Sequence, residues 1–203
     1  LFMSDNGSLD AVDNIEMGVW ENDKNKRPHS GDWIYRNPLS LIGRKGEVWD
    51  NGIRSPLLVR WPGKIKAGKV TDHLSAFWDI SPTVRELAGA EPQADTDGIS
   101  MVPLLLGKGA QKKHDYLYWE FFEMGGKRAI LKGKWKLILY ITNTDLNPGI
   151  ELFNLSQDMS EKKNVADAYP EIVSELRALM ESAHTPAECK QFKLASERKQ
   201  SSK

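Results

Sequence analysis

The first 90 residues alternate short apolar runs with longer polar stretches. Residues 1–3 predict the end of a β-strand, and the continuous apolar run at 55–61 is typical of a strand buried on both faces. Ser81 as an N-cap and Gly89 as a C-terminal stop predict a short helix between them. We expect three apolar side chains of this helix to point inward: Val84, Leu87 and Ala88. The pattern predicts an α/β domain over residues 1–90.

Beyond a polar linker at residues 91–97, the pattern changes to short strands separated by glycine-containing turns. The predicted strands are 116–122, 128–131, 135–141 and 151–155. From Pro170 onward, apolar residues recur at helical spacing, which predicts a helix lying on the sheet. Its apolar stripe comprises Ile172, Val173, Leu176, Leu179, Met180 and Ala183. Residues 91–190 are therefore predicted to form an antiparallel-sheet subdomain, followed by a disordered tail at 191–203.

Composition narrows the possible functions only slightly. The chain has 203 residues, of which 40% are apolar, so it can build a substantial core. Its 28 basic and 28 acidic residues cancel, which gives no net attraction for nucleic acid or an anionic membrane. No apolar run is long enough to span a bilayer. The single cysteine, Cys189, excludes an internal disulfide.

The opening apolar run ends abruptly at Ser4-Asp5-Asn6-Gly7. Active sites of α/β proteins gather where strands end, and a carboxylate beside an amide carbonyl offers the hard oxygen ligands that Ca²⁺ or Mg²⁺ prefers. Ser-Asp-Asn-Gly is also a good turn sequence in its own right. Asp5 and Asn6 are candidate metal ligands on this basis, with an ordinary turn as the alternative.

A second stretch supports the functional interpretation. Residues 43–56 read GRKGEVWDNGIRSP and continue into an apolar run that ends in Trp61-Pro62-Gly63. This order resembles the sulfatase family of the alkaline-phosphatase-like superfamily, whose members carry S-D-N-G, then G-K-G-x-x-(W/Y)-E-G-G-x-R-x-P, then W-P-G. Further segments at 79–89, 97–105, 133–138 and 151–155 resemble the family's later motifs. The combination is specific, although each piece alone is weak.

The resemblance implies a fold, an activity and a set of site residues. The fold would be the C-terminal part of the family's α/β sandwich, followed by a small α+β subdomain with a four-stranded antiparallel sheet and a C-terminal helix. Asp5 and Asn6 would bind Ca²⁺ or Mg²⁺ together with carboxylates outside this chain. Lys45 would contact the sulfate group and offset charge developing on the ester, as a catalytic and substrate-binding residue.

The family's nucleophile is absent from this sequence. Sulfatases carry C-x-(P/A)-x-R upstream of S-D-N-G, and its Cys, or Ser in some members, becomes formylglycine. Cys189 lies in a segment with neither the proline nor the arginine. We therefore interpret the chain as the C-terminal part of a sulfatase that hydrolyses a sulfated sugar or aryl sulfate. It would be inactive alone, would need the N-terminal part of the same protein, and by resemblance would be periplasmic or secreted.

The second motif departs from the family at two positions, since Asp50-Asn51 stands where Glu-Gly is usual. Asn51 could accept a left-handed backbone, so the change is conformationally acceptable. We expect Arg54 to form a buried bidentate pair and Trp49 to be a core aromatic rather than a pocket residue.

The polar stretch at residues 8–42 is long enough to be functional, although a solvated loop is the alternative. Its aromatic and basic residues would suit a sulfated sugar. No role is assigned to the charged residues of the predicted hairpins, which we expect to be solvated, or to two isolated histidines. The hairpin residues are His114, Glu120, Glu123 and Lys127, and the two isolated histidines are His73 and His184.

Two other functions remain open. Phosphodiesterases and phosphonate hydrolases of the same superfamily share the metal chemistry, and the nucleophile that would help separate them lies outside this chain. A noncatalytic, glycan-binding fragment is the second alternative.

Overall fold

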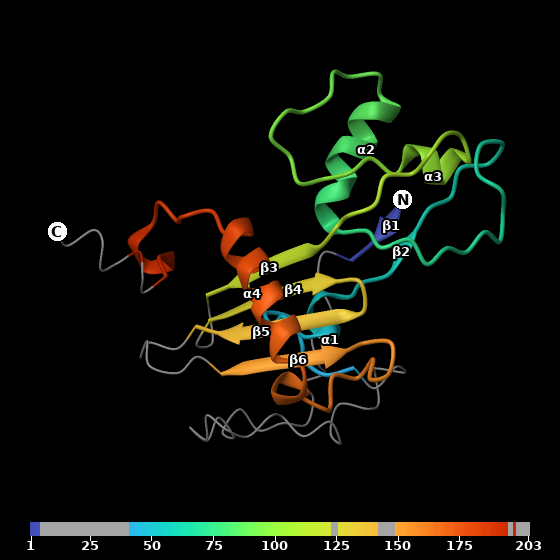
Figure 1. Cartoon of the computed structure of the whole chain (residues 1–203). Helices are drawn as coiled ribbons and strands as arrows, with labels where there is room; N and C mark the ends of the chain where they lie inside the picture. Colours follow the sequence, from blue (N-terminus) through green and yellow to red (C-terminus); the bar gives the residue numbers. More distant parts are fainter. Residues whose placement is uncertain (5–40, 123–125, 142–148, 195–196, 198–203) are drawn as a thin grey trace, which may run out of the picture. The chain divides into compact units, whose positions relative to one another are not determined.

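The computed structural model describes residues 1–4, 41–122, 126–141, 149–194 and 197 (Figure 1). It divides into two compact units. Unit 1 comprises residues 1–5 and 56–117, and unit 2 comprises residues 6–55 and 118–203.

The centre of unit 2 is a four-stranded antiparallel sheet with the order β3-β4-β5-β6. The strands are β3 (Leu117–Phe121), β4 (Lys127–Lys132), β5 (Trp135–Tyr140) and β6 (Ile150–Asn154). Leu137 on β5 lies opposite Ile130 on β4 and Leu152 on β6, and all three side chains are fully buried. Every strand neighbours the next one in sequence, as short turns between strands require.

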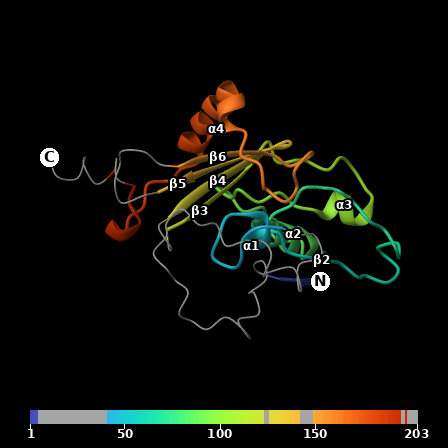
Figure 2. The same ribbon diagram turned by 90° about the horizontal axis from the view of Figure 1, so that it is seen from below.

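Helix α4 (Pro170–Ala183) packs on β4 and β5 on one face of the sheet, and the segment that contains α1 (Asp50–Ile53) covers the other face (Figure 2). Pro170 begins α4 at a position where its missing N–H costs nothing. Leu176 and Met180, one turn apart, are the buried side chains of this helix. Because successive strand residues point to opposite faces, each strand contributes one row of side chains to each layer.

The core beneath α1 combines the motif segment with the sheet. Val48 and Trp49 pack against Ala129, Ile138 and Phe153, which come from three different strands. The partly buried residues around this cluster are Ile42, Trp119, Phe121, Tyr140 and Leu155. Trp49 is only 4% exposed, so the prediction that it is a core aromatic is confirmed.

The chain from Ile42 to Arg54 folds into a tight loop that ends in α1. The Asn51 N–H donates to the Ile42 carbonyl at 2.9 Å, and the Asn51 side-chain amide donates to the Gly43 carbonyl at 2.6 Å. Gly52 sits where no side chain fits, because an added Cβ would lie 2.2 Å from the Glu47 carbonyl oxygen. Asn51 is helical, so the position does not require a left-handed backbone, and its side chain closes the loop.

Unit 1 contains two short strands, β1 (Phe2–Met3) and β2 (Leu57–Leu58), which pair antiparallel. Its helical elements are η2 (Phe77–Asp79), α2 (Ile80–Leu87) and α3 (Val102–Leu106). The strand at residues 1–3 is confirmed. The longer strand predicted at 55–61 is reduced to two residues, and Leu58 is 63% exposed, so the expectation of burial on both faces was wrong for this unit.

Asp79 and Thr83 orient α2 through polar contacts. The Asp79 carboxylate, 1% exposed, accepts hydrogen bonds from the N–H groups of Ala76 and Ile99, each at 2.8 Å. His114 Nε2 lies 2.9 Å and 3.0 Å from its two oxygens. Thr83 is the buried residue of α2, and its hydroxyl accepts a hydrogen bond from the Met101 N–H.

Two details of the α2 prediction were therefore wrong. Asp79, not Ser81, occupies the N-cap position, and Val84 and Leu87 are 54% and 40% exposed instead of inward. Thr83 is the buried residue of α2, and its hydroxyl contacts the chain at Met101, whereas Val84 and Leu87 are open in unit 1.

The strands and helix predicted for residues 116–183 agree with β3 to β6 and α4 to within about two residues at each end. Two further short helices connect or follow them, η3 (Ala166–Ala168) and η4 (Lys190–Phe192).

Gly52→Ala is expected to disrupt the 42–54 loop, because its Cβ would collide with backbone atoms that cannot move independently. We expect the free energy of unfolding to fall by about 3 kcal/mol or more, as measured by urea denaturation. Gly63→Ala is the control, since nothing lies within 4 Å of its added Cβ and only its positive φ opposes the change. Equal losses in the two variants would show that the close contact at Gly52 is unimportant.

Candidate functional site

Lys45 lies exposed at the tip of a turn between two left-handed glycines, Gly43 at φ 93° and Gly46 at φ 86°. The turn is closed from both sides. The Glu47 N–H donates to the Arg44 carbonyl at 3.0 Å, and the Arg44 N–H donates to the Glu47 carboxylate at 3.1 Å. The lysine ammonium is therefore presented to solvent from a backbone that is held by hydrogen bonds.

The loop that carries Lys45 ends at a buried carboxylate. Asp50 is the first residue of α1 and is 3% exposed. One of its oxygens accepts two hydrogen bonds from Arg54, at 2.9 Å from Nε and 2.7 Å from Nη2. The side chain of Arg54 is 47% exposed, so the predicted structural pair is present but is not buried.

The other oxygen of Asp50 contacts a fully buried lysine. Lys136 on β5 is 0% exposed, and its ammonium lies 2.8 Å from Asp50 Oδ1 and 2.6 Å from Glu161 Oε1. The second Glu161 oxygen accepts a hydrogen bond from the Asp50 N–H at 2.7 Å. We call Asp50, Lys136 and Glu161 the buried network. It joins the Lys45 loop, the central strand β5 and the segment after β6.

Opposite influences act on the two acids of the buried network. Burial alone would raise the pKa of Asp50, but the adjacent Lys136 ammonium and the Arg54 guanidinium outweigh it and lower that pKa. Burial dominates at Glu161, where the nearby Asp50 charge adds to it, and raises the pKa to about 7. The two carboxyl groups thus have clearly different proton affinities although they share one lysine.

Glu161 also adopts an uncommon backbone conformation. Its φ of 51° is in the left-handed region, which non-glycine residues rarely occupy. The Glu161 N–H donates to the Asp158 carbonyl at 3.2 Å, and the Asp158 carboxylate accepts a hydrogen bond from the Lys163 N–H at 2.7 Å. Such local strain persists only where surrounding contacts hold it.

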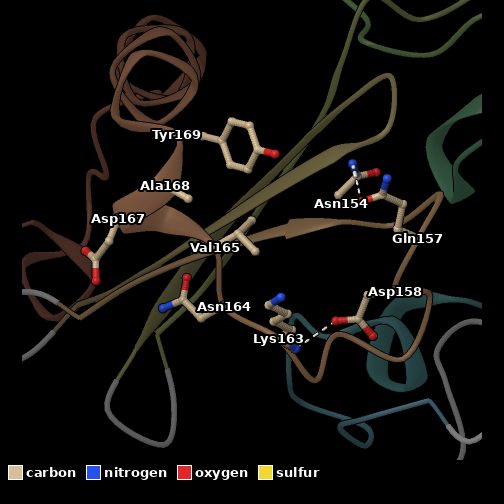
Figure 3. A pocket seen from close by; sticks show the side chains of 9 residues that line it. All are labelled: Asn154, Gln157, Asp158, Lys163, Asn164, Val165, Asp167, Ala168 and Tyr169. Carbon is tan, nitrogen blue, oxygen red and sulfur yellow. Dashed lines mark hydrogen bonds between the residues drawn. The ribbon is translucent and has the colours of Figure 1, made fainter.

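A cavity of about 460 Å³ opens beside this segment (Figure 3). Its lining residues are Asn154, Gln157, Asp158, Lys163, Asn164, Val165, Asp167, Ala168 and Tyr169. Much of its polar lining is already used: Asn164 accepts from the Leu152 N–H at 3.0 Å and donates to the Ile150 carbonyl at 2.9 Å. Asn154 accepts from the Ser156 hydroxyl at 2.7 Å. These groups shape the segment between β6 and α4, and they do not define a ligand site.

Lys127, 8% exposed, lies near the aromatic part of the same core. Its ammonium is 5.1 Å from the Trp49 ring centroid and 5.7 Å from that of Tyr140, and burial lowers its pKa. Burial likewise raises the pKa of Glu47. The expectation that Lys127 is solvated was therefore wrong, because the alternation of β4 turns it toward the α1 segment.

Glu120 also differs from the solvated residue that we expected, as does His114, whose side chain is 7% exposed beside Asp79. Glu120, on the α4 face of β3, contacts His184 Nδ1 and the Tyr118 hydroxyl. The Arg128 guanidinium lies in the same cluster, donates to Tyr118 at 2.7 Å and pairs with Glu181 at 2.9 Å. These contacts fasten the end of α4 to the sheet. Glu123 lies outside the described residues.

The predicted metal ligands Asp5 and Asn6, and the polar stretch at 8–42 apart from its last two residues, lie outside the described residues. Within the part of the chain that the structure does describe, no cluster of three or more His, Cys, Asp or Glu could hold a metal ion. Of the three predicted site residues, Lys45 is therefore the one that the structure describes.

Two members of the buried network were missed in the sequence. Lys136 had a signal, because the run Trp135-Lys136-Leu137-Ile138 places one cation on the same strand face as Ile138, where a buried charge needs a partner. Glu161 had none, since it lies in a polar stretch and only the fold brings it to Lys136.

Comparisons with known proteins identify the family. The model for the C-terminal part of N-sulphoglucosamine sulphohydrolase matches residues 44–185. An uncharacterized sulfatase of Schizosaccharomyces pombe is 31% identical over 201 residues, which cover 87% of this chain and 36% of that protein. Human arylsulfatase A is 32% identical over 159 residues, covering 66% of this chain and 31% of the enzyme. The chain belongs to the sulfatase family and matches its C-terminal portion, spanning about a third of these relatives.

Solved structures that superpose on this chain include sulfatases. A 2-O GAG sulfatase superposes with a TM-score of 0.60 at 28% identity, covering 70% of this chain and 32% of that one. A protein solved in complex with its substrate D-glucosamine-2-N,6-O-disulfate superposes with a TM-score of 0.55 at 27% identity, covering 64% and 28%. The predicted mixed α/β fold of the alkaline-phosphatase-like class is confirmed. Among the described residues, no helix is long and apolar enough to cross a membrane.

Glu161→Gln is expected to change how stability depends on pH. A carboxyl whose pKa rises from 4.5 to about 7 on folding stabilises the protein below pH 4.5, and this contribution disappears as the pH rises through 7. The unfolding free energy of the wild type relative to the variant should therefore fall by about 2 kcal/mol across that window.

Urea denaturation at several pH values measures this difference. Glu175→Gln, at an exposed pair with Lys132, is the matched control and should show a difference that varies little with pH. A wild-type advantage that grows with pH would mean that Lys136 keeps Glu161 ionised throughout.

Proposed function

We propose that this chain supplies the sulfate-binding lysine and part of the metal site of an enzyme that hydrolyses sulfate esters. The observation that carries the proposal is the Lys45 turn: an exposed lysine between two left-handed glycines, in a loop whose backbone is closed by hydrogen bonds and anchored in the core. A compact ammonium held in this way can meet an oxyanion without much reorganisation.

Lys45 would be the residue of this chain that contacts the sulfate group. Its ammonium would hold a sulfate oxygen in the bound ester and offset the negative charge that grows there as the ester bond breaks. Because the backbone is fixed beforehand, the interaction can strengthen in the transition state. The nucleophile, formylglycine by family resemblance, would come from residues outside this sequence.

Asp5 and Asn6 suit a hard cation by the chemistry of their donors, a carboxylate and an amide carbonyl. Two such residues fall short of the six to eight oxygens that Ca²⁺ takes, so further ligands would have to come from elsewhere in the protein. When bound, Ca²⁺ or Mg²⁺ would stabilise negative charge on the sulfate group. The choice between these two ions is part of the proposal.

The N-terminal part of the same protein is the partner that we propose for unit 1. The apolar side chains of Phe2, Leu58 and Phe77 are 64%, 63% and 55% exposed, and two apolar residues of α2 are also open. Exposed apolar groups on one unit are typical of a surface that another part of a protein covers. Residues 1–90 would then complete the catalytic domain, and residues 91–190 would form the C-terminal subdomain.

A sulfated sugar is the substrate class that we favour. A matching relative is the N-acetylgalactosamine-6-O-sulfatase of Bacteroides thetaiotaomicron, 31% identical over 205 residues that cover 91% of this chain and 36% of that enzyme. Aryl sulfate is the second candidate, since arylsulfatase A is a comparable match. A phosphonate monoester hydrolase from Silicibacter pomeroyi superposes with a TM-score of 0.56 at 23% identity, which supports only a shared fold.

Lys45→Ala, made in the complete protein that contains this chain, is expected to lower kcat/KM for sulfate-ester hydrolysis by about a hundredfold or more, because one charge-stabilising contact is lost. Release of inorganic sulfate from a sulfated monosaccharide measures the effect. Lys64→Ala is the matched control, since Lys64 is also exposed beside a glycine and should leave the rate unchanged. A variant with full activity would remove Lys45 from the site.

The chain by itself is expected to bind Ca²⁺ weakly and to hydrolyse no sulfate ester, because two oxygen ligands cannot satisfy the ion. Isothermal calorimetry with Ca²⁺ and the isolated chain provides the measurement. A tight site with one ion per chain would contradict the proposal that ligands outside this sequence complete it.

A further inference from the structure

We propose that the buried network of Asp50, Lys136 and Glu161 positions Lys45, so that Lys136 and Glu161 are positioning residues of the sulfate site although neither reaches the substrate. The inference rests on the proposed function of Lys45. It assigns a role to two residues for which the sequence alone had suggested none.

The connection begins at Asp50. This residue lies at the end of the loop that carries Lys45. Its N–H donates to Glu161 at 2.7 Å, and one of its carboxylate oxygens lies 2.8 Å from the Lys136 ammonium. Asn51, the next residue, bonds back to Ile42 and Gly43 on the other side of the Lys45 turn. The two ends of the loop are therefore held together, and the network fixes them to the sheet.

The contacts within the buried network resist displacement of Asp50. The Lys136 ammonium is completely buried between two carboxylates, so any shift of Asp50 would leave a charge without compensation in a low-dielectric interior. Arg54 occupies the remaining Asp50 oxygen, which leaves that carboxylate little freedom to rotate.

Glu161 contacts Lys136 from an unfavourable backbone conformation. The residue is fully buried and has a left-handed backbone, and Asp158 and Asn164 brace the segment around it through hydrogen bonds to backbone groups (Figure 3). A simple connection between β6 and α4 would not need a buried acid at a strained position.

The experiment is a double-mutant cycle in the complete protein, with para-nitrophenyl sulfate as substrate. Glu161→Gln keeps the size of the side chain but removes the carboxyl group that contacts Lys136. We expect kcat to fall about ten- to a hundredfold while KM changes less than about threefold, because a small displacement of a catalytic group mainly affects the transition state. In a Lys45→Ala background the same change should lower kcat less than about twofold.

The cycle separates positioning from general structural support. A purely structural role would lower kcat by the same factor in both backgrounds, and that result would overturn the inference. Glu175→Gln is the matched control, because it breaks only an exposed ion pair in the same unit. Asp50→Asn is made in parallel, so that a failure of Glu161→Gln to fold does not prevent the test.

Hydrogen exchange across residues 43–52 tests the inference without any assay of activity. We expect faster exchange of these amides in Glu161→Gln than in the wild type, and no change in Glu175→Gln. Unchanged exchange in Glu161→Gln would overturn the positioning role. A wild-type protein that hydrolyses no sulfate ester would instead contradict the proposed function, and exchange would still decide whether the network holds the loop.

Discussion

A fully buried ammonium is the constraint on which unit 2 depends. Removing the Lys136 charge from water costs several kcal/mol, and the interior recovers this only through close partners of opposite charge. Those partners, Asp50 and Glu161, come from separate segments of the chain. The loop before α1 and the segment after β6 must therefore both be in place when β5 is buried, which couples local motifs to one tertiary arrangement.

A buried carboxylate is also central to unit 1, where its side-chain partner is a histidine. Asp79 is buried, accepts two backbone N–H groups and contacts His114, so a single carboxylate joins η2, the chain at Ile99 and the chain at His114. In both units an acidic residue from a short motif is a structural centre. Carboxylates in such motifs need not be catalytic, and in this protein the exposed Lys45 is the better candidate for chemistry.

The secondary structure of residues 116–183 could be predicted well, because strand alternation and helical spacing are local properties of the sequence. Predictions of burial failed where the position of a side chain depends on tertiary contacts. Val84 and Leu87 of α2 are exposed in unit 1, and Lys127 is buried because the register of β4 turns it toward Trp49. The site was predictable only in part: Lys45 was proposed from its motif, whereas Glu161 carried no signal.

The sequence by itself determined the family, the order of strands and the exposed lysine between glycines, since all of these are encoded in short contiguous segments. Only the tertiary structure decided what anchors that lysine. Asp50, Lys136 and Glu161 are brought together over sequence separations of up to 111 residues, and no local pattern records such a meeting. Burial then gives the three charges their importance, because a low-dielectric interior makes each of them depend on the others.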